Sequence, residues 1–248
     1  MAWQETIDAL EKGTLRAAIH TGDHWVADEK VKAEILSAFK AGKLAGYSGI
    51  YDGFVDKDNL PPRYFEPVEG VRLVPGGSAV RRGAYIAEGV VIMPPSYINT
   101  GAYIGAGSMI DSHVLVGSCA QIGKNVHLSA GVQIGGVLEP VGMNPVIIED
   151  DCFLGAGSVV VEGVLVKSGA VIAPGVILSK SIPVYDCVRE VILGKGAAIP
   201  AGAVVIPGTR PAGTSWATEL GLSVSCPLII KYRDHGTDAS LELEEALR

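Results

Sequence analysis

Two side chains that can exchange protons stand beside aliphatic residues in the middle of the sequence. His127 precedes Leu128, and Asp111 follows Ile110. A neutral imidazole accepts protons near pH 7, and a carboxylate either does the same or stabilises its own turn. Because Leu128 lies eighteen positions after Ile110, the structural repeat around them decides whether the two polar side chains share a surface.

That repeat has a period of six residues. Sixteen aliphatic residues keep this register in two runs, separated by a jump of fourteen positions. The first run is Val80, Ile86, Ile92, Ile98, Ile104, Ile110, Val116, Ile122, Leu128 and Ile134, and the second is Ile148, Leu154, Val160, Val166, Ile172 and Leu178. Such hexads are typical of a mainly β fold, the parallel β-helix, in which each hexad forms a short strand and a turn.

Three hexads make one coil of eighteen residues, and successive coils stack about 4.8 Å apart. The stacking predicts that Asp111 and His127 lie on one face, a coil apart. We expect each turn to lie at the small residue after the aliphatic, as Gly105 follows Ile104. The jump contains eight extra residues, so residues 137–146 should leave the coils as a loop, where functional groups often lie.

The flanking regions have other patterns. Residues 3–42 carry apolar residues at helical spacing, with Asp28 as the expected cap of a second helix. Residues 46–67 form a connector rich in Gly, Asp and Pro. Strands are predicted at 199–208 and 222–232 and a helix at 240–248, elements that would cover the open end of the coils. The predicted organisation is an N-terminal helical domain with its connector (1–70), a β-helix (71–208) and a C-terminal cap (209–248).

Composition narrows the function classes. The net charge of −7 does not favour nucleic-acid binding, which uses clustered Lys and Arg. No run approaches the roughly 18 apolar residues of a membrane span, and the polar N-terminus has no signal-peptide pattern. The four cysteines are scattered without paired spacing, so neither a zinc site nor a disulfide framework is expected. We expect a cytoplasmic protein without a metal.

Several segments resemble one enzyme family. They are RLVPGGSAV and the residues up to Asp111, VGSCAQIGKNVHLSAGVQIGGVLEP (116–140), NPVIIEDDCFLGAGSVVVEGV (144–164), PAGAVVIPG (200–208) and, more weakly, LEKGTLRAA and WVADEKVKAEILSAF. The resemblance is to the tetrahydrodipicolinate N-succinyltransferases of bacterial lysine (diaminopimelate) biosynthesis. It implies a left-handed β-helix, a homotrimer with sites between subunits, and succinyl-CoA as donor. The acceptor would be the amine of a hydrated or ring-opened amino dicarboxylate.

The resemblance also implies roles for individual residues. Arg72 matches the family arginine that binds a substrate carboxylate, and Asp111 matches the aspartate that contacts the substrate and assists its amine. Gly136 is expected at the substrate and Gly135 at the coenzyme, because glycine lets a ligand approach the backbone, although simple packing explains both glycines as well. Ala156 is a further expected coenzyme contact. His127 is a candidate catalytic base, but the corresponding family histidine is not the accepted one, so it can instead line the cleft or pack in the trimer.

One position departs from the family pattern. Where the family has a glutamate in SEIVEGV, this chain has SVVVEGV, which places Val159 there; we interpret the neighbouring Glu162 as a turn residue. Related acetyltransferases also have an aliphatic residue at that position. An acetyl-CoA-dependent homologue, acting on the same or a similar amine in tabtoxin-like secondary metabolism, is therefore an alternative.

An alternative of another class is a hexapeptide-repeat scaffold or zinc hydratase without acyltransferase activity. Such hydratases hold zinc with histidines from neighbouring subunits. Only His113 and His127 of the five histidines lie in the coils, and they are fourteen positions apart on different faces of one subunit. Only a cleft between subunits could bring them together.

Overall fold

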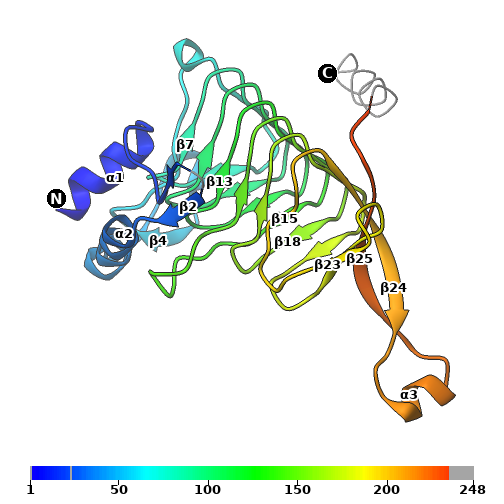
Figure 1. Cartoon of the computed structure of the whole chain (residues 1–248). Coiled ribbons are helices and arrows are strands. Elements are labelled where there is room, and N and C mark those ends of the chain that lie inside the picture. Colours follow the sequence, from blue (N-terminus) through cyan, green and yellow to red (C-terminus); the bar gives the residue numbers. More distant parts are fainter. Residues whose placement is uncertain (1, 23, 235–248) are drawn as a thin grey trace.

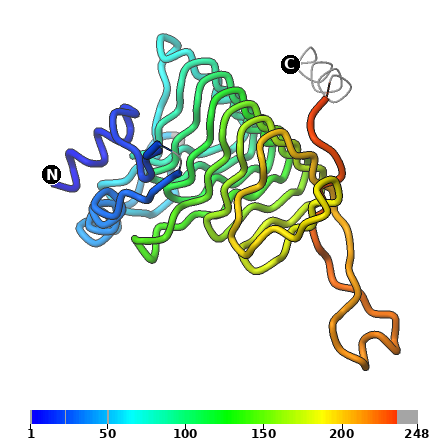
Figure 2. The backbone as a smooth tube through the Cα atoms, in the orientation of Figure 1, coloured from blue at the N-terminus to red at the C-terminus, as the bar shows by residue number. Residues whose placement is uncertain are grey.

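The computed structural model describes residues 2–22 and 24–234. Its body is a stack of parallel coils, with two helices on one side and a long C-terminal hairpin at the far end (Figure 1). The helix predicted at 240–248 lies outside the described residues. Figure 2 shows the coils following one another in chain order along the stack.

The coils present three parallel sheets, which we name after one outward residue each. The Arg72 face contains β5 (Arg72–Leu73), β8 (Val91–Ile92), β11 (Met109–Ile110), β14 (His127–Leu128), β17 (Phe153–Leu154) and β20 (Val171–Ile172). The Tyr103 face contains β7 (Tyr85–Ile86), β10 (Tyr103–Ile104), β13 (Gln121–Ile122), β16 (Ile147–Ile148) and β19 (Leu165–Val166). The Val159 face contains β6 (Ala79–Val80), β9 (Tyr97–Ile98), β12 (Leu115–Val116), β15 (Gln133–Ile134), β18 (Val159–Val160) and β21 (Ile177–Leu178).

The six-residue register is the register of the core. All sixteen aliphatic residues of the repeat are buried, with exposed fractions of 6% or less. Ile104 pairs with Ile122, which lies eighteen positions later. Ile122 pairs with Ile148, and their separation is eighteen positions plus the eight inserted residues. Each fully buried aliphatic side chain contributes roughly 1.5–3 kcal/mol, so the repeat accounts for a large part of the apolar stabilisation of the body.

The turns differ from the expectation. The left-handed backbone conformation occurs three residues after the inward aliphatic, as at Gly101 (φ 81°) after Ile98, and non-glycine residues such as Asn125 (φ 52°) also adopt it. The small residues directly after the aliphatics serve close stacking instead, because a Cβ on Gly117 would collide with the backbone nitrogen of Gly136 in the next coil. These positions therefore keep neighbouring coils in contact.

The N-terminal region contains two of the predicted helices, α1 (Trp3–Glu11) and α2 (Glu29–Ala41). Asp28 caps α2 as predicted, since its Oδ1 accepts a hydrogen bond of 3.0 Å from the backbone N–H of Val31. The connector contains the strand pair β3 (Leu44–Gly46) and β4 (Val55–Lys57) and the short 3₁₀ helices η1 (Gly49–Tyr51) and η2 (Pro67–Glu69).

The prediction that residues 3–42 are helical is wrong for the segment between these helices. Here β1 (Ala18–Thr21) and β2 (His24–Ala27) form an antiparallel hairpin. The turn contains Gly22, whose φ of 67° is easy for glycine. The hairpin's other support is distant in sequence: Asn144 of the insertion accepts a 2.7 Å hydrogen bond from the Ala27 N–H and donates one of 2.9 Å to the Trp25 carbonyl.

The C-terminal strands continue the Arg72 face beyond β20. Both predicted strands are confirmed as β24 (Ala203–Pro211) and β25 (Ser223–Tyr232), an antiparallel pair with α3 (Ser215–Glu219) at its tip (Figure 1). The shorter β22 (Val184–Asp186) and β23 (Val191–Leu193) extend the same sheet. Val205 and Ile229 are fully buried in the main core, so this hairpin covers the last coil. β24 runs across position 208, where the β-helix was expected to end.

Candidate functional site

The Arg72 face brings together three of the residues selected from the sequence. Arg72 pairs with Val91, Val91 with Met109, and Met109 with His127. Arg72 and His127 therefore occupy one outward column, three strand spacings or about 14 Å apart. Asp111 directly follows β11 of the same sheet, at the corner where the chain turns toward the Val159 face.

The backbone of Asp111 is held firmly in this corner. Its N–H donates to the Leu128 carbonyl at 2.9 Å, and its carbonyl accepts a 2.7 Å hydrogen bond from the hydroxyl of Ser96. Oδ1 of the half-buried side chain accepts a 2.7 Å hydrogen bond from the Ser112 N–H, which is the turn-stabilising role considered above. Oδ2 accepts no hydrogen bond from the residues that the structure describes. One carboxylate oxygen thus fixes the orientation, and the other is open to a ligand.

Arg72 is an exposed residue at the start of the same sheet. Its N–H donates to the Val90 carbonyl at 2.9 Å, which anchors the backbone at the first coil. Its guanidinium forms no hydrogen bond or ion pair within 2–22 and 24–234, so all five of its N–H donors can serve a carboxylate.

His127 is half-buried in the column between Met109 and Phe153. Its ring meets the Phe153 ring edge to face, with 5.0 Å between centroids and 79° between planes. The backbone N–H of His127 donates to the Cys152 carbonyl at 2.9 Å. The aromatic contact packs one side of the imidazole against an apolar group.

The expected coenzyme and substrate contacts divide between two corners. Ala156 is exposed just after β17, at the same corner as Asp111 and two coils further on, about 10 Å away by strand spacing. Gly135 and Gly136 follow β15 at another corner. A Cβ on Gly135 would lie 3.0 Å from the Val161 side chain, and a Cβ on Gly136 would collide with the backbone nitrogen of Ser118. Packing therefore accounts for both glycines, and one chain alone does not bring them to Asp111.

Val159 lies on the Val159 face, paired with Gln133 and Ile177 and half-buried. It is thus on a different sheet from Arg72 and His127. Glu162 has the backbone conformation of a turn residue (φ 59°), and its carboxylate accepts a 3.0 Å hydrogen bond from the Lys180 N–H. The interpretation of Glu162 as structural agrees with this geometry.

Sequence reasoning missed the contacts that hold the insertion loop. Lys32 of α2 has 0% exposure, and its Nζ donates to the carbonyls of Met143 at 2.7 Å and Pro140 at 3.2 Å. Burial lowers the pKa of the Lys32 ammonium. The sequence carried one indication that Lys32 is buried: it lies three residues before Ile35, so helical spacing places both on the buried side of α2.

Three further properties concern the part of the chain that the structure describes. None of its helices is long and apolar enough to cross a bilayer. Nor does it contain a group of three or more His, Cys, Asp or Glu side chains placed to hold a metal ion. All four cysteines are free thiols, and only Cys187 is exposed.

Comparison with known proteins gives consistent matches. A profile described as the hexapeptide repeat of succinyl-transferase matches residues 145–180. The 2,3,4,5-tetrahydropyridine-2,6-dicarboxylate N-succinyltransferase of Paraburkholderia phymatum is 47% identical over 98% of this chain and 86% of its own length. Proteins of the same name from Coxiella burnetii and Paracoccus denitrificans are 45% and 42% identical, each over 100% of this chain and 89% of their own.

A solved structure supports the fold. It is a crystal structure of a Campylobacter jejuni protein named as a 2,3,4,5-tetrahydropyridine-2-carboxylate N-succinyltransferase, with a TM-score of 0.52 and 19% identity. The match covers 92% of this chain, which spans 62% of that protein's length. With full-length relatives of 42–47% identity, this chain belongs to the 2,3,4,5-tetrahydropyridine-2,6-dicarboxylate N-succinyltransferase family.

Proposed function

We propose that the protein transfers the succinyl group of succinyl-CoA to the amine of hydrated or ring-opened tetrahydropyridine-2,6-dicarboxylate. The observation that carries this proposal is the placement of Arg72 and Asp111 on one face, in a chain 47% identical to an enzyme of that name. An open guanidinium and a carboxylate with one open oxygen match the amine and one of the two carboxylates of an amino dicarboxylate, since a guanidinium binds a carboxylate and a carboxylate accepts from an amine.

The reaction needs only a positioned base and positioned donors. The amine lone pair attacks the thioester carbonyl, an amide C–N bond forms, the C–S bond breaks, and coenzyme A leaves as the thiolate. Asp111 Oδ2 accepts the proton that the amine loses, and this proton then neutralises the thiolate. Arg72 holds a carboxylate of the acceptor so that its amine faces the thioester, which lowers the entropic part of the barrier.

We propose that the site is completed between subunits of a homotrimer. Gly135 and Gly136 lie at a different corner from Asp111 in one chain, so a neighbouring copy is needed to place the coenzyme arm beside Asp111. Sedimentation equilibrium at micromolar concentration is expected to give a trimer, and a stable monomer would contradict this part of the proposal. We place the enzyme in the cytoplasm, because its free thiols suit a reducing compartment.

A second candidate donor is acetyl-CoA, and the apolar side chain of Val159 is the observation that favours it. Val159 makes apolar a position at which the family resemblance implies a carboxylate, and its neighbour Ile177 adds apolar surface. The same acceptor, or a similar amine in secondary metabolism, would then receive an acetyl group. The zinc-hydratase and scaffold alternatives give way to the family assignment.

The test is release of free thiol from each donor. Purified protein is incubated with tetrahydropyridine-2,6-dicarboxylate and either succinyl-CoA or acetyl-CoA, with reactions lacking acceptor as the control for hydrolysis. Acceptor-dependent thiol release with succinyl-CoA supports the proposal, and release with acetyl-CoA alone supports the second candidate. Release with neither donor would overturn the assignment of this acceptor.

A further inference from the structure

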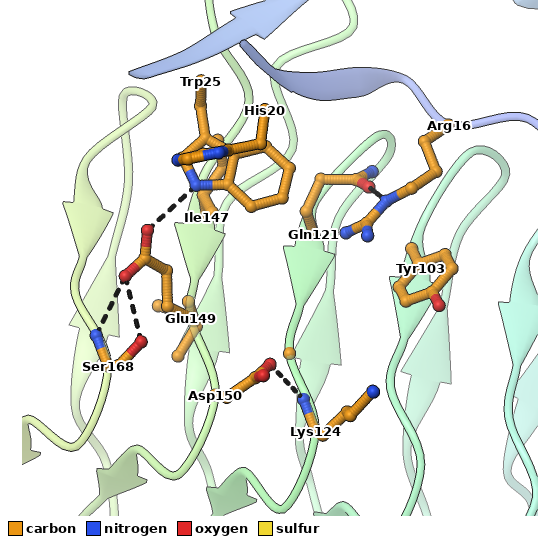
Figure 3. Close-up of a pocket in the computed structure, with 12 residues that line it drawn as sticks. Arg16, His20, Trp25, Tyr103, Gln121, Lys124, Ile147, Glu149, Asp150 and Ser168 are labelled. Atoms are coloured by element: carbon orange, nitrogen blue, oxygen red, sulfur yellow. Dashed lines mark hydrogen bonds between the residues drawn. The ribbon is translucent and has the colours of Figure 1, made fainter. Parts of the chain in front are cut away.

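A cavity of about 450 Å³ lies between the β1–β2 hairpin and the Tyr103 face (Figure 3). Its lining comes from the N-terminal region and from four neighbouring coils. The polar and aromatic side chains in it are Arg16, His20, Trp25, Tyr103, Gln121, Lys124, Glu149, Asp150 and Ser168. None of these residues belongs to the Arg72 face, so the cavity is separate from the acyl-transfer site proposed above.

Arg16 is held in the cavity wall in a fixed orientation. Its guanidinium carbon lies 3.8 Å from the centroid of the Tyr103 ring and 5.1 Å from that of Trp25. Its Nε donates to Gln121 Oε1 at 2.8 Å. Gln121 is itself 1% exposed, and its amide nitrogen donates to the Cys119 carbonyl at 2.8 Å, which fixes which end of the amide faces Arg16.

The two terminal nitrogens of Arg16 donate to no residue that the structure describes. Burial lowers the pKa of this guanidinium, the nearby Tyr103 and Asp150 oppose that shift, and an arginine keeps its proton. A desolvated cation that has unused donors is costly unless an anion pairs with it. With Nε already bound to Gln121, the terminal nitrogens are the donors left for an oxygen ligand.

Two carboxylates, those of Asp150 and Glu149, also line the cavity. Asp150 Oδ1 accepts a 2.8 Å hydrogen bond from the Lys124 N–H, and its Oδ2 accepts none from the described residues. Glu149 differs, because both of its oxygens are used: Oε1 accepts from Trp25 Nε1 at 3.0 Å, and Oε2 accepts from the N–H and hydroxyl of Ser168 at 3.0 and 3.1 Å. Glu149 thus fixes Trp25 (Figure 3), and Asp150 has an open oxygen.

The formal charges of the lining balance, since Arg16 and Lys124 offset Glu149 and Asp150 at neutral pH. A dianion would therefore gain less here than a molecule carrying one charge of each sign. The rings of His20, Trp25 and Tyr103 and the side chain of Ile147 also line the cavity, and such apolar surface suits an apolar side chain.

From this arrangement we propose that the cavity is a binding site for a small zwitterion, an α-amino acid. Its carboxylate pairs with the terminal nitrogens of Arg16, its ammonium group faces Asp150, and its side chain packs on Tyr103 and Trp25. The ligand bridges the N-terminal hairpin and the coils, so binding also ties these two parts together.

Calorimetric titration of the full-length protein tests this proposal with L-leucine and L-lysine as probes at millimolar concentration. Two analogues of leucine each lack one charge: 4-methylpentanoate has no ammonium group, and 3-methylbutylamine has no carboxylate. We expect at least one amino acid to bind and both analogues to bind at least about tenfold more weakly than leucine or not at all.

Variants locate the binding. Asp150→Asn keeps an oxygen for the Lys124 N–H and removes only the charge, and Arg16→Gln removes the guanidinium; each should weaken amino-acid binding about tenfold or more. Arg72→Gln is the matched control and should leave that binding unchanged. The proposal is overturned if neither amino acid binds, if 4-methylpentanoate binds as tightly as leucine, or if Asp150→Asn has no effect.

Discussion

The ammonium group of Lys32 donates a 2.7 Å hydrogen bond to the carbonyl of Met143, although the two residues lie 111 positions apart. A second hydrogen bond from the same nitrogen reaches Pro140 at 3.2 Å. A helix of the N-terminal region therefore fixes the loop that leaves the coils directly after Gly135 and Gly136. In this way α2 influences the position of a loop beside the expected coenzyme contact.

Replacing Lys32 by methionine keeps much of the side-chain volume and removes both hydrogen bonds. Two loop carbonyls then lose their donors, so the free energy of unfolding should fall by about 1–3 kcal/mol. Urea unfolding measures this change, and limited proteolysis should show faster cleavage within residues 137–146. Lys30→Met on the exposed side of α2 is the control and should change neither. Equal behaviour of the two variants would show that the loop is held by other contacts.

Asp111→Asn should lower turnover about 100-fold or more, the scale of losing general acid–base help. An asparagine Oδ1 still accepts from the Ser112 N–H, so the melting temperature should stay close to that of the wild type. Asp111→Ala removes both functions and should lower turnover and stability together. Full activity of Asp111→Asn would leave the residue as a turn stabiliser only.

Val159→Glu introduces the carboxylate that the family resemblance implies at this position. If the missing carboxylate limits the reaction, the succinyl-transfer rate should rise in this variant, whereas Ile177→Glu, one coil away on the same face, should not raise it. Loss of activity with both donors would mean that the pocket has adapted to an apolar residue. The family mechanism would then not apply at this position.

The buried thiols predict a specific reactivity. Burial raises the pKa of Cys119 and of Cys152 to about 12, from 9.0. In the folded protein a thiol reagent should therefore modify Cys187 rapidly and the buried cysteines only after unfolding. Above pH 9 the unfolded state loses thiol protons that the folded state keeps, so these two groups lower stability as the pH rises from 9 toward 12. Rapid modification of Cys119 at neutral pH would contradict the packing described here.

The β-helix was predictable because its core is a local pattern. Each inward aliphatic, such as Ile104, is buried by residues at a fixed spacing of eighteen, and the interruption of that spacing located the insertion. The corner shared by Asp111 and Ala156 follows from the same arithmetic.

The remaining features depend on distant contacts. The β1–β2 hairpin has only four residues in each strand and is completed by Asn144. In the sequence Lys32 is one more charged residue on a helix, and only the fold shows the loop carbonyls that bind it. Arg16 contacts Gln121, which lies 105 positions away. No repeat in the local sequence indicates such contacts, so the hairpin, the buried lysine and the cavity could be identified only from the three-dimensional structure.

The most direct measurement of the central claim is mass spectrometry of the product. The protein is given tetrahydropyridine-2,6-dicarboxylate with equal concentrations of succinyl-CoA and acetyl-CoA, and Asp111→Asn is treated identically. The predicted result is an amide carrying the succinyl group as the main product, formed about 100-fold more slowly by the variant. An acetylated product alone, or no acylated product from the wild type, would contradict succinyl transfer as the function of this protein.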